Sequence, residues 1–334
     1  MRSLRQGSEP TAVVGAGRGS GGRDVSSRQS RSDVSPEKRA KARTINESRN
    51  WFYFILFAGP NMALILAFVY YPLIMNARYS TLDWRLGART AKNVGLANYI
   101  EFFTSPGGTS VWTTTIIFAV STVIGSMLLG LLMALVLNRK LPGTTFTRTA
   151  MFSPYVLSGV GIGLIWSFMF DPQLGILRYV FEYFGKTSPN WFLHDNLTLF
   201  VAIIVYIWRN LGYCTVIFIS GLQSIPQDLL EAAQVDGAGP VRSFFNITLP
   251  LLSPTMFFLL VSMTLASMQA FDILKILKPS GEGVNTFVFE IYRQSFGVYQ
   301  RAGYASAIAV VLFVTLALIT VIQFKFVDRK VHYA

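Results

Sequence analysis

The sequence predicts an all-α, polytopic membrane protein with six transmembrane helices. Three observations predict this class: an apolar composition, a set of apolar runs long enough to cross a bilayer, and an uneven distribution of Lys and Arg between the loops. Of the 334 residues, 52% are hydrophobic and 14% are charged, and the mean hydropathy is +0.44. Such a composition is typical of chains that fold in lipid rather than in water.

The six predicted spans follow from the thickness of hydrocarbon that a helix must cross, about 20 residues for about 30 Å. Five uncharged runs reach this length, at residues 51–77, 110–138, 149–170, 243–271 and 302–324. A sixth run, 197–222, is interrupted only by Arg209. A β-barrel would need short segments of alternating polarity, which the sequence lacks.

The orientation of the spans follows from the basic residues. Lys and Arg near short loops are retained on the cytoplasmic side of a membrane. The basic residues beside the spans are Arg39, Lys41, Arg43 and Arg49 before the first, Arg139, Lys140 and Arg148 after the second, and Lys325, Arg329 and Lys330 after the last. These three groups share one side only if six helices cross, so we expect both termini and the loop 231–254 to be cytoplasmic.

Residues 1–50 predict a disordered, basic cytoplasmic tail that precedes the membrane domain, 51–334. The tail holds eleven Lys and Arg against five Asp and Glu, and it is rich in Gly and Ser. Such a segment buries too little apolar surface to offset its ordering entropy. The formal charge of +12 raises nucleic-acid binding as an alternative, but a tail of this kind is expected at an anionic lipid surface instead, with no nucleic-acid partner.

Residues that could carry catalysis or bind a metal or nucleotide are scattered. The single cysteine, Cys214, lies inside the fourth predicted span, so no intramolecular disulfide can form. The two histidines, His194 and His332, fall on opposite sides of the membrane in the predicted topology, which argues against a metal site. The tetrapeptide GKTS at 185–188 imitates the end of a phosphate-binding loop, but Val180 occupies the position of the glycine that this motif needs. We therefore expect no enzyme activity and no cofactor in this chain.

The loop 222–250 has a pattern typical of two short helices joined by a turn. The first helix is predicted at 225–233, where a proline suits the first turn and acidic residues lie near the positive helix end. Glycines then allow the positive φ that a chain reversal needs. The residues behind this prediction are Pro226, Asp228 and Glu231 in the first helix, Gly237 and Gly239 in the turn, Pro240 in the second helix, and Pro250 and Pro254 before the fifth span.

The same loop has the features of a docking element lying along the membrane face. Ala232 and Ala233 have small side chains, so another backbone can approach this side of the predicted helix closely. Its apolar side chains are expected to hold it against the membrane domain; they are Leu229, Leu230, Phe244, Phe245 and Ile247.

The stretch EAAQVDGAGPVRSFFNITLP, 231–250, resembles the EAA loop of permease subunits of binding-protein-dependent ABC importers. The matching residues are Glu231, Ala232, Ala233, Asp236, Gly237, Ile247, Leu249 and Pro250. Further segments, such as FDPQLGIL at 170–177 and QFKFVDRKVHY at the C-terminal end, are similar to the sugar and glycerol-phosphate branch of that family. Within the branch, the resemblance is strongest to the permeases for sn-glycerol-3-phosphate and its diesters.

The resemblance implies a permease subunit of the bacterial inner membrane, whose EAA loop inserts into a cytoplasmic ATPase as a coupling helix. It also implies three partners: a second, different permease subunit, an ATPase homodimer that binds ATP and Mg, and an extracytoplasmic solute-binding protein. The implied cargo is glycerol-3-phosphate or a glycerophosphodiester, with a neutral sugar or oligosaccharide as the alternative. An ion-coupled secondary transporter or a membrane scaffold would be functions of another class.

The predicted helix interiors contain a set of polar residues that could line a substrate pathway. Arg209 lies about midway along its span, where a charge is costly unless it faces a polar cavity or a partner. The other candidates are Asn210 and Tyr213 on the same helix, and Ser262, Gln269 and Asp272 at helical spacing on the next. Two interpretations stay open for Arg209: contact with the substrate, or a structural ion pair with Asp272.

Overall fold

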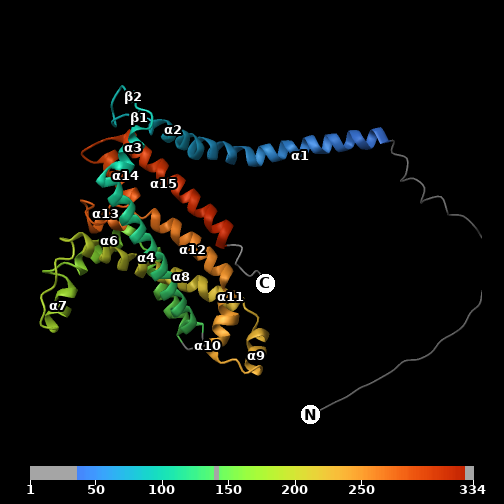
Figure 1. Ribbon diagram of the computed structural model, residues 1–334. Coiled ribbons are helices and arrows are strands. Elements are labelled where there is room, and N and C mark those ends of the chain that lie inside the picture. The colour runs from blue at the N-terminus through green and yellow to red at the C-terminus, as the bar shows by residue number, and fades with distance from the viewer. Residues whose placement is uncertain (1–35, 139–142, 328–334) are drawn as a thin grey trace, which may run out of the picture. The chain divides into compact units, whose positions relative to one another are not determined.

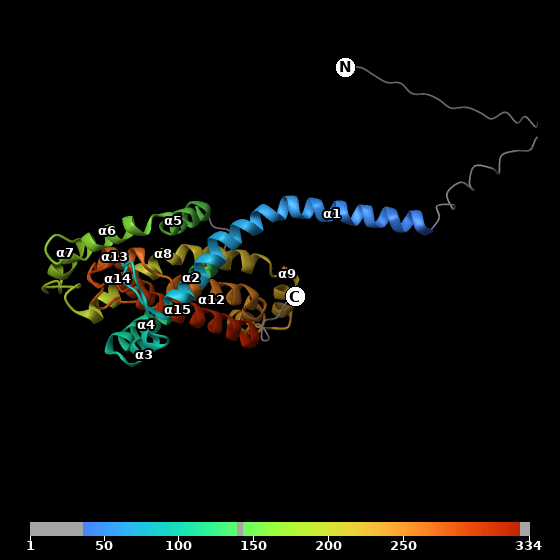
Figure 2. The same cartoon turned by 90° about the horizontal axis from the view of Figure 1, so that it is seen from above.

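The computed structural model describes residues 36–138 and 143–327, and the chain divides into two units, Met1–Val69 and Tyr70–Ala334. The helices, labelled in Figures 1 and 2, are α1 (Pro36–Ile65), α2 (Tyr71–Tyr79), α3 (Ala97–Thr104), α4 (Pro106–Leu137), α5 (Thr144–Val156), α6 (Gly159–Met169), α7 (Ile176–Tyr183), α8 (Asp195–Gln223), α9 (Gln227–Val235), α10 (Pro240–Ser243), α11 (Leu249–Leu251), α12 (Ser253–Met268), α13 (Asp272–Leu277), α14 (Phe287–Phe296) and α15 (Ala302–Ile322). The strands are β1 (Leu82–Asp83) and β2 (Lys92–Asn93), and π-helical turns lie at Leu66–Tyr70, Phe244–Thr248 and Gln323–Val327.

In the first unit, α1 begins well before the apolar run at residue 51. Pro36 occupies the first helical position, where its missing N–H has no cost, and the next residues include the strong helix formers Glu, Lys, Arg and Ala. The backbone of 36–50, which the sequence assigns to the tail, is helical. The rest of that predicted tail, 1–35, lies outside the described residues.

Five helical segments are long and apolar enough to cross a membrane, and a bent pair makes a sixth. The five are Trp51–Tyr79, Pro106–Leu137, Asp195–Gln223, Ser253–Leu277 and Ala302–Lys325. The pair is α5 and α6, which are bent by 99° at a short break. By length and composition, residues 36–138 and 143–327 thus hold five candidate spans, or six if the bent pair counts as one. The third predicted span is not one straight helix.

Two predicted spans differ from the structure for identifiable reasons. The third, expected as continuous from 149 to 170, breaks after Pro154, where Leu157 is extended with φ −67° and ψ 149°. The fifth, expected from residue 243, begins at Ser253, because 240–251 form short helical segments of the preceding loop. It is also interrupted between α12 and α13, where Phe271 has φ −144° and ψ −60°.

In the second unit, α8 lies among α4, α5, α12 and α13 and makes its longest contact with α4. Small residues allow that contact: a Cβ on Gly130 of α4 would overlap the Cβ of Cys214 on α8. Figure 2 shows α5, α6 and α7 following one another in a row, in which α5 packs on α8 and α6 on α13. Three apolar clusters fill the spaces between these helices, centred on buried side chains such as Phe118, Phe218 and Phe287. α8 is therefore the element against which candidate site residues are positioned.

The second unit has two different ends. At the hairpin end, β1 and β2 pair antiparallel, and Arg301 donates two 2.6 Å hydrogen bonds to the carboxylate of Glu101.

Asp171 lies between α6 and α7, and its carboxylate accepts hydrogen bonds from the N–H groups of Gln173 and Leu174 at 2.8 Å. These bonds lower the pKa of its carboxyl below the ordinary value.

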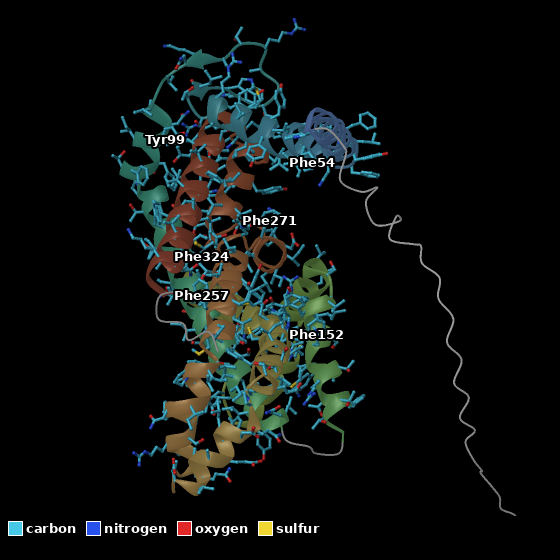
Figure 3. The ribbon with its side chains drawn as sticks, turned by 90° about the vertical axis from the view of Figure 1, so that its right-hand side faces the viewer. Phe54, Tyr99, Phe152, Phe257, Phe271 and Phe324 are labelled. Carbon is cyan, nitrogen blue, oxygen red and sulfur yellow. The ribbon has the colours of Figure 1, made fainter. Side chains whose placement is uncertain are left out.

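At the other end, the α9 end, the short helices α9 to α11 project beyond the long helices (Figure 1). The rings of Phe257 on α12 and Phe324 after α15 meet edge-to-face with centroids 5.1 Å apart, as the labels in Figure 3 allow the reader to follow. This contact joins α12 to the turn that follows α15.

Candidate functional site: a projecting two-helix loop and a polar strip

The two-helix loop, residues 224–252, begins with α9, whose ends are fixed by local chemistry. Pro226 precedes the helix, and Asp228 in the first turn lies near the positive end of the helix dipole. The helix stops in a glycine-dependent cap: the Ala238 N–H donates to the Ala233 carbonyl at 2.9 Å and the Gly237 N–H to the Gln234 carbonyl at 3.0 Å. Gly237 has φ +77°, as the sequence predicts.

The second half of the loop also begins where the sequence predicts, at Pro240. The helix is short, however, and passes through a π-helical turn into α11 and then α12. Gly239 has φ −66° and ψ 164°, so the expectation of a positive φ at this second glycine is wrong. The chain reversal needs only one left-handed residue, and Gly237 supplies it.

The matching residues of the loop are mostly exposed. Glu231, Ala232, Asp236 and Gly237 are exposed, Ala233 is buried, and Ile247 and Pro250 are half-buried. Ala233 and the partly buried Leu230 thus hold α9 against the rest of the chain. Leu229 and Phe245, which were expected to pack inward, are 46% and 59% exposed. The outward face of the loop is therefore apolar as well as charged.

No residue of this outward face is paired with another charge. The ion pairs among the described residues are Arg178–Glu182, Lys278–Glu282, Arg293–Glu290 and Arg301–Glu101. Asp228, Glu231 and Arg242 take part in none of them. Exposed apolar side chains beside unpaired charges, on a helix with a fixed end, form a surface suited to a protein partner.

The second candidate region is a polar strip, made of Arg209, Tyr213, Ser262, Gln269 and Asp272. Gln269 and Asp272 are exposed, and the other three are half-buried. Arg209 and Tyr213 lie one turn apart on α8, and Tyr213 contacts the hydroxyl of Ser262 on α12. The sixth predicted residue, Asn210, does not belong to the strip: it is 7% exposed, and its side chain donates to the Tyr206 carbonyl at 2.8 Å.

Arg209 has no ion-pair partner among the described residues, so the pair with Asp272, one of the two interpretations of this residue, is not formed in this structure. Its Nε is buried without a hydrogen-bond partner. Leaving a buried donor unsatisfied costs roughly 1–3 kcal/mol, and more for a charged group. The Nε of Arg209 therefore has capacity for an acceptor that the described residues do not supply.

Breaks in two helices position Asp272 of the strip beside α6. α6 starts at Gly159, and a Cβ on that glycine would lie 2.8 Å from the Cβ of Asp272, the first residue of α13. One turn later, a Cβ on Gly163 would lie 2.7 Å from the Cβ of Ile276. The close approach of α6 and α13 fixes Asp272 at the level of the two breaks. In membrane proteins, non-helical backbone at such depth is found where it lines a cavity or is buried in protein.

Tyr155 belongs to this region but is not among the site residues that the sequence predicts. Tyr155, near the end of α5, stacks on Tyr213 with ring centroids 4.7 Å apart and an interplanar angle of 14°. The contact depends on how closely α5 approaches α8 and on where α5 ends. Neither feature has a signal in the local sequence, apart from Pro154 within the apolar run.

No group of three or more His, Cys, Asp or Glu able to hold a metal ion occurs within 36–138 and 143–327. The thiol of Cys214 is buried.

Comparison with known proteins identifies a family. Residues 126–333 match the sequence profile of the family described as "Binding-protein-dependent transport system inner membrane component". The sn-glycerol-3-phosphate transport system permease protein UgpA of Agrobacterium fabrum is 34% identical over 283 residues, covering 83% of this chain and 95% of that protein. The proteins of the same name from Yersinia pestis bv. Antiqua (strain Antiqua) and Brucella suis biovar 1 are each 32% identical, covering 86% and 84% of this chain and 97% and 96% of their own length.

Two solved structures share the fold. One is a bacterial ABC transporter involved in the import of the acidic polysaccharide alginate, and the other is the alginate transporter in complex with an alginate pentasaccharide-bound periplasmic protein. Each gives a TM-score of 0.74 at 20% identity and covers 85% of this chain, with 97% and 96% of the other chain aligned.

Proposed function

The chain belongs to the family of binding-protein-dependent transport system inner membrane components, and from that membership we propose that it imports glycerol-3-phosphate or its diesters. It is a multi-pass permease subunit of an ABC importer in the inner membrane. An ion-coupled carrier and a membrane scaffold are therefore excluded. The cargo, the partner subunits and the roles of individual residues form the proposal.

The proposed mechanism is based on one observation: α9 projects from the long helices and ends in a cap that requires Gly237. The two-helix loop lies on the cytoplasmic side and docks into an ATPase dimer, which binds ATP and Mg. Closure of the dimer on ATP moves the loop, and α9 passes that movement to the long helices through Leu230 and Ala233. A ligand shifts a two-state protein only by its differential affinity for the two states. A short rigid helix transmits such a shift better than a mobile loop would.

The proposed complex contains a second permease, because one chain of this family supplies half of the pathway. The exposed members of the polar strip, Gln269 and Asp272, support this arrangement, since in the complete importer they face the second subunit across the pathway. A solute-binding protein delivers the cargo at the hairpin end. One of the solved relatives by fold was determined with such a periplasmic protein bound.

Three relatives named for sn-glycerol-3-phosphate support the cargo. The unsatisfied guanidinium of Arg209 supports it independently, because Arg offers a planar set of donors to phosphate oxygens. A neutral sugar would leave that charge without an anionic partner.

The cargo is tested by titrating the cognate solute-binding protein calorimetrically with glycerol-3-phosphate, glycerophosphocholine, maltose and trehalose. We expect binding of one or both phosphorylated compounds, together with ATP-dependent uptake of the same compound by proteoliposomes that contain the complete importer. Binding of a neutral sugar alone would contradict the proposed cargo and leave the family membership intact. Uptake without ATP would contradict the proposed coupling.

A further inference from the structure

An aromatic pair lies one helical turn along α8 from Arg209, whose buried Nε has no hydrogen-bond partner. Tyr155 of α5 and Tyr213 of α8 are stacked almost in parallel. Tyr213 follows Arg209 by four residues on the same helix, so their Cβ atoms are about 5–6 Å apart. Tyr155 is 37% exposed, and Tyr213 contacts the hydroxyl of Ser262 on α12. Helices α5 and α12 thus bring a ring face and a hydroxyl to Tyr213, one turn of α8 away from the Arg209 cation.

This arrangement is built into the backbone. At Gly212, which precedes Tyr213, an added Cβ would overlap the backbone of Met151 and Phe152 on α5. The two helices therefore touch one turn before Tyr155, near Phe152, which is labelled in Figure 3. α5 ends at Val156, so Tyr155 occupies its last turn, beside the break that leads to α6.

We propose that Tyr155 and Tyr213 form an aromatic platform that packs against the glycerol part of the substrate while Arg209 binds its phosphate. Ring faces are negatively polarised and attract the positively polarised C–H groups of carbons that carry hydroxyls. A guanidinium one turn away matches the separation between a phosphate and the carbon chain that bears it. Selective small-molecule sites combine apolar ring surface with a few fixed polar groups in this way. The proposal rests on the proposed cargo and adds a residue, Tyr155, that sets its selectivity.

The test uses the purified importer complex without its solute-binding protein, and it measures equilibrium binding of two probes, glycerol-3-phosphate and inorganic phosphate. Inorganic phosphate has the anionic group but no carbon chain. We expect Tyr155→Leu to weaken glycerol-3-phosphate binding by about tenfold, equivalent to about 1.4 kcal/mol, and to leave phosphate binding unchanged. Tyr155→Phe keeps the ring face and retains wild-type binding of both probes. Arg209→Gln weakens both.

The matched control is Tyr183→Leu, the same substitution at a side chain of α7 that is 86% exposed and does not belong to the strip; it should bind both probes as the wild type does. Equal losses for the two probes in Tyr155→Leu, or no loss, would overturn the platform while glycerol-3-phosphate import by the wild type upholds the cargo. Loss of the second permease from the Tyr155→Leu complex would show a structural contact instead. Import of neutral sugars only by the wild type would overturn both proposals.

Discussion

Gly212 shows how a single residue controls the geometry of the polar strip. A side chain at this position would overlap the backbone of Met151 and Phe152, which cannot move without shifting α5. We therefore predict that Gly212→Ala destabilises the protein by about 1–3 kcal/mol, the usual cost of overpacking a tight contact. Thermal denaturation of the purified complex measures the effect. Gly161→Ala on α6 is the matched control, because nothing lies within 4 Å of its added Cβ; equal shifts in the two variants would contradict the explanation.

At this scale the sequence predicts residues whose role is local and misses those whose role is tertiary. The positive φ of Gly237 follows from its position after a short helix, whereas the same reasoning fails for Gly239, because one left-handed residue already completes the turn. The sequence identifies Arg209 by its charge but cannot choose its partner. The role of Tyr155 cannot be predicted from the sequence, because its contact with Tyr213 forms only when α5 packs on α8.

Among the elements, α9 has the most specific requirement, a left-handed residue directly after its end. We predict that Gly237→Ala uncouples transport: ATP hydrolysis by the complex persists while ATP-driven uptake falls severalfold. The left-handed conformation costs a residue with a side chain about 1–2 kcal/mol, so the end of α9 frays and transmits less movement. Uptake and hydrolysis are measured in the same proteoliposomes.

Gly239→Ala isolates the cause of that effect. Both glycines have no atom within 4 Å of an added Cβ, and they differ in φ, +77° against −66°. Gly239→Ala should therefore transport at the wild-type rate. If the two alanine variants behave alike, backbone conformation does not explain the role of Gly237.

Helix existence is predictable from this sequence, but helix continuity is not. The span of α8 agrees within two residues at its start and one at its end, because its apolar run is long and is bounded by polar residues. The break between α5 and α6 cannot be predicted from the position of a proline alone. Pro60 lies inside α1, which is unbroken, whereas Pro154 lies shortly before the break that ends α5. What differs is tertiary, namely the packing of Gly159 on Asp272.

For the whole molecule, composition and the count of apolar runs predict the membrane class, and the loop pattern predicts the family. The side of the membrane on which each end lies depends on charge counting alone. Several of the basic residues used in that count, such as Arg139, Lys140 and Arg329, lie outside the described residues. The orientation therefore rests on the charge distribution in the sequence and not on the packing of the helices.

The orientation can be tested on the whole molecule with two single cysteines in a Cys214→Ala background, since Cys214 is the one native cysteine and is buried. Val235 at the end of α9 and Val298 at the hairpin end are 87% and 96% exposed in this chain. In cells that lack the ATPase subunit, a cysteine at either position should therefore react equally well with a small maleimide once the cells are opened. In intact cells treated with a membrane-impermeant maleimide, we predict that Val298→Cys is labelled and Val235→Cys is protected. This outcome follows if the basic residues beside the α9 end are retained in the cytoplasm. Labelling of Val235→Cys in intact cells would reverse the orientation and make docking of the two-helix loop to a cytoplasmic ATPase impossible.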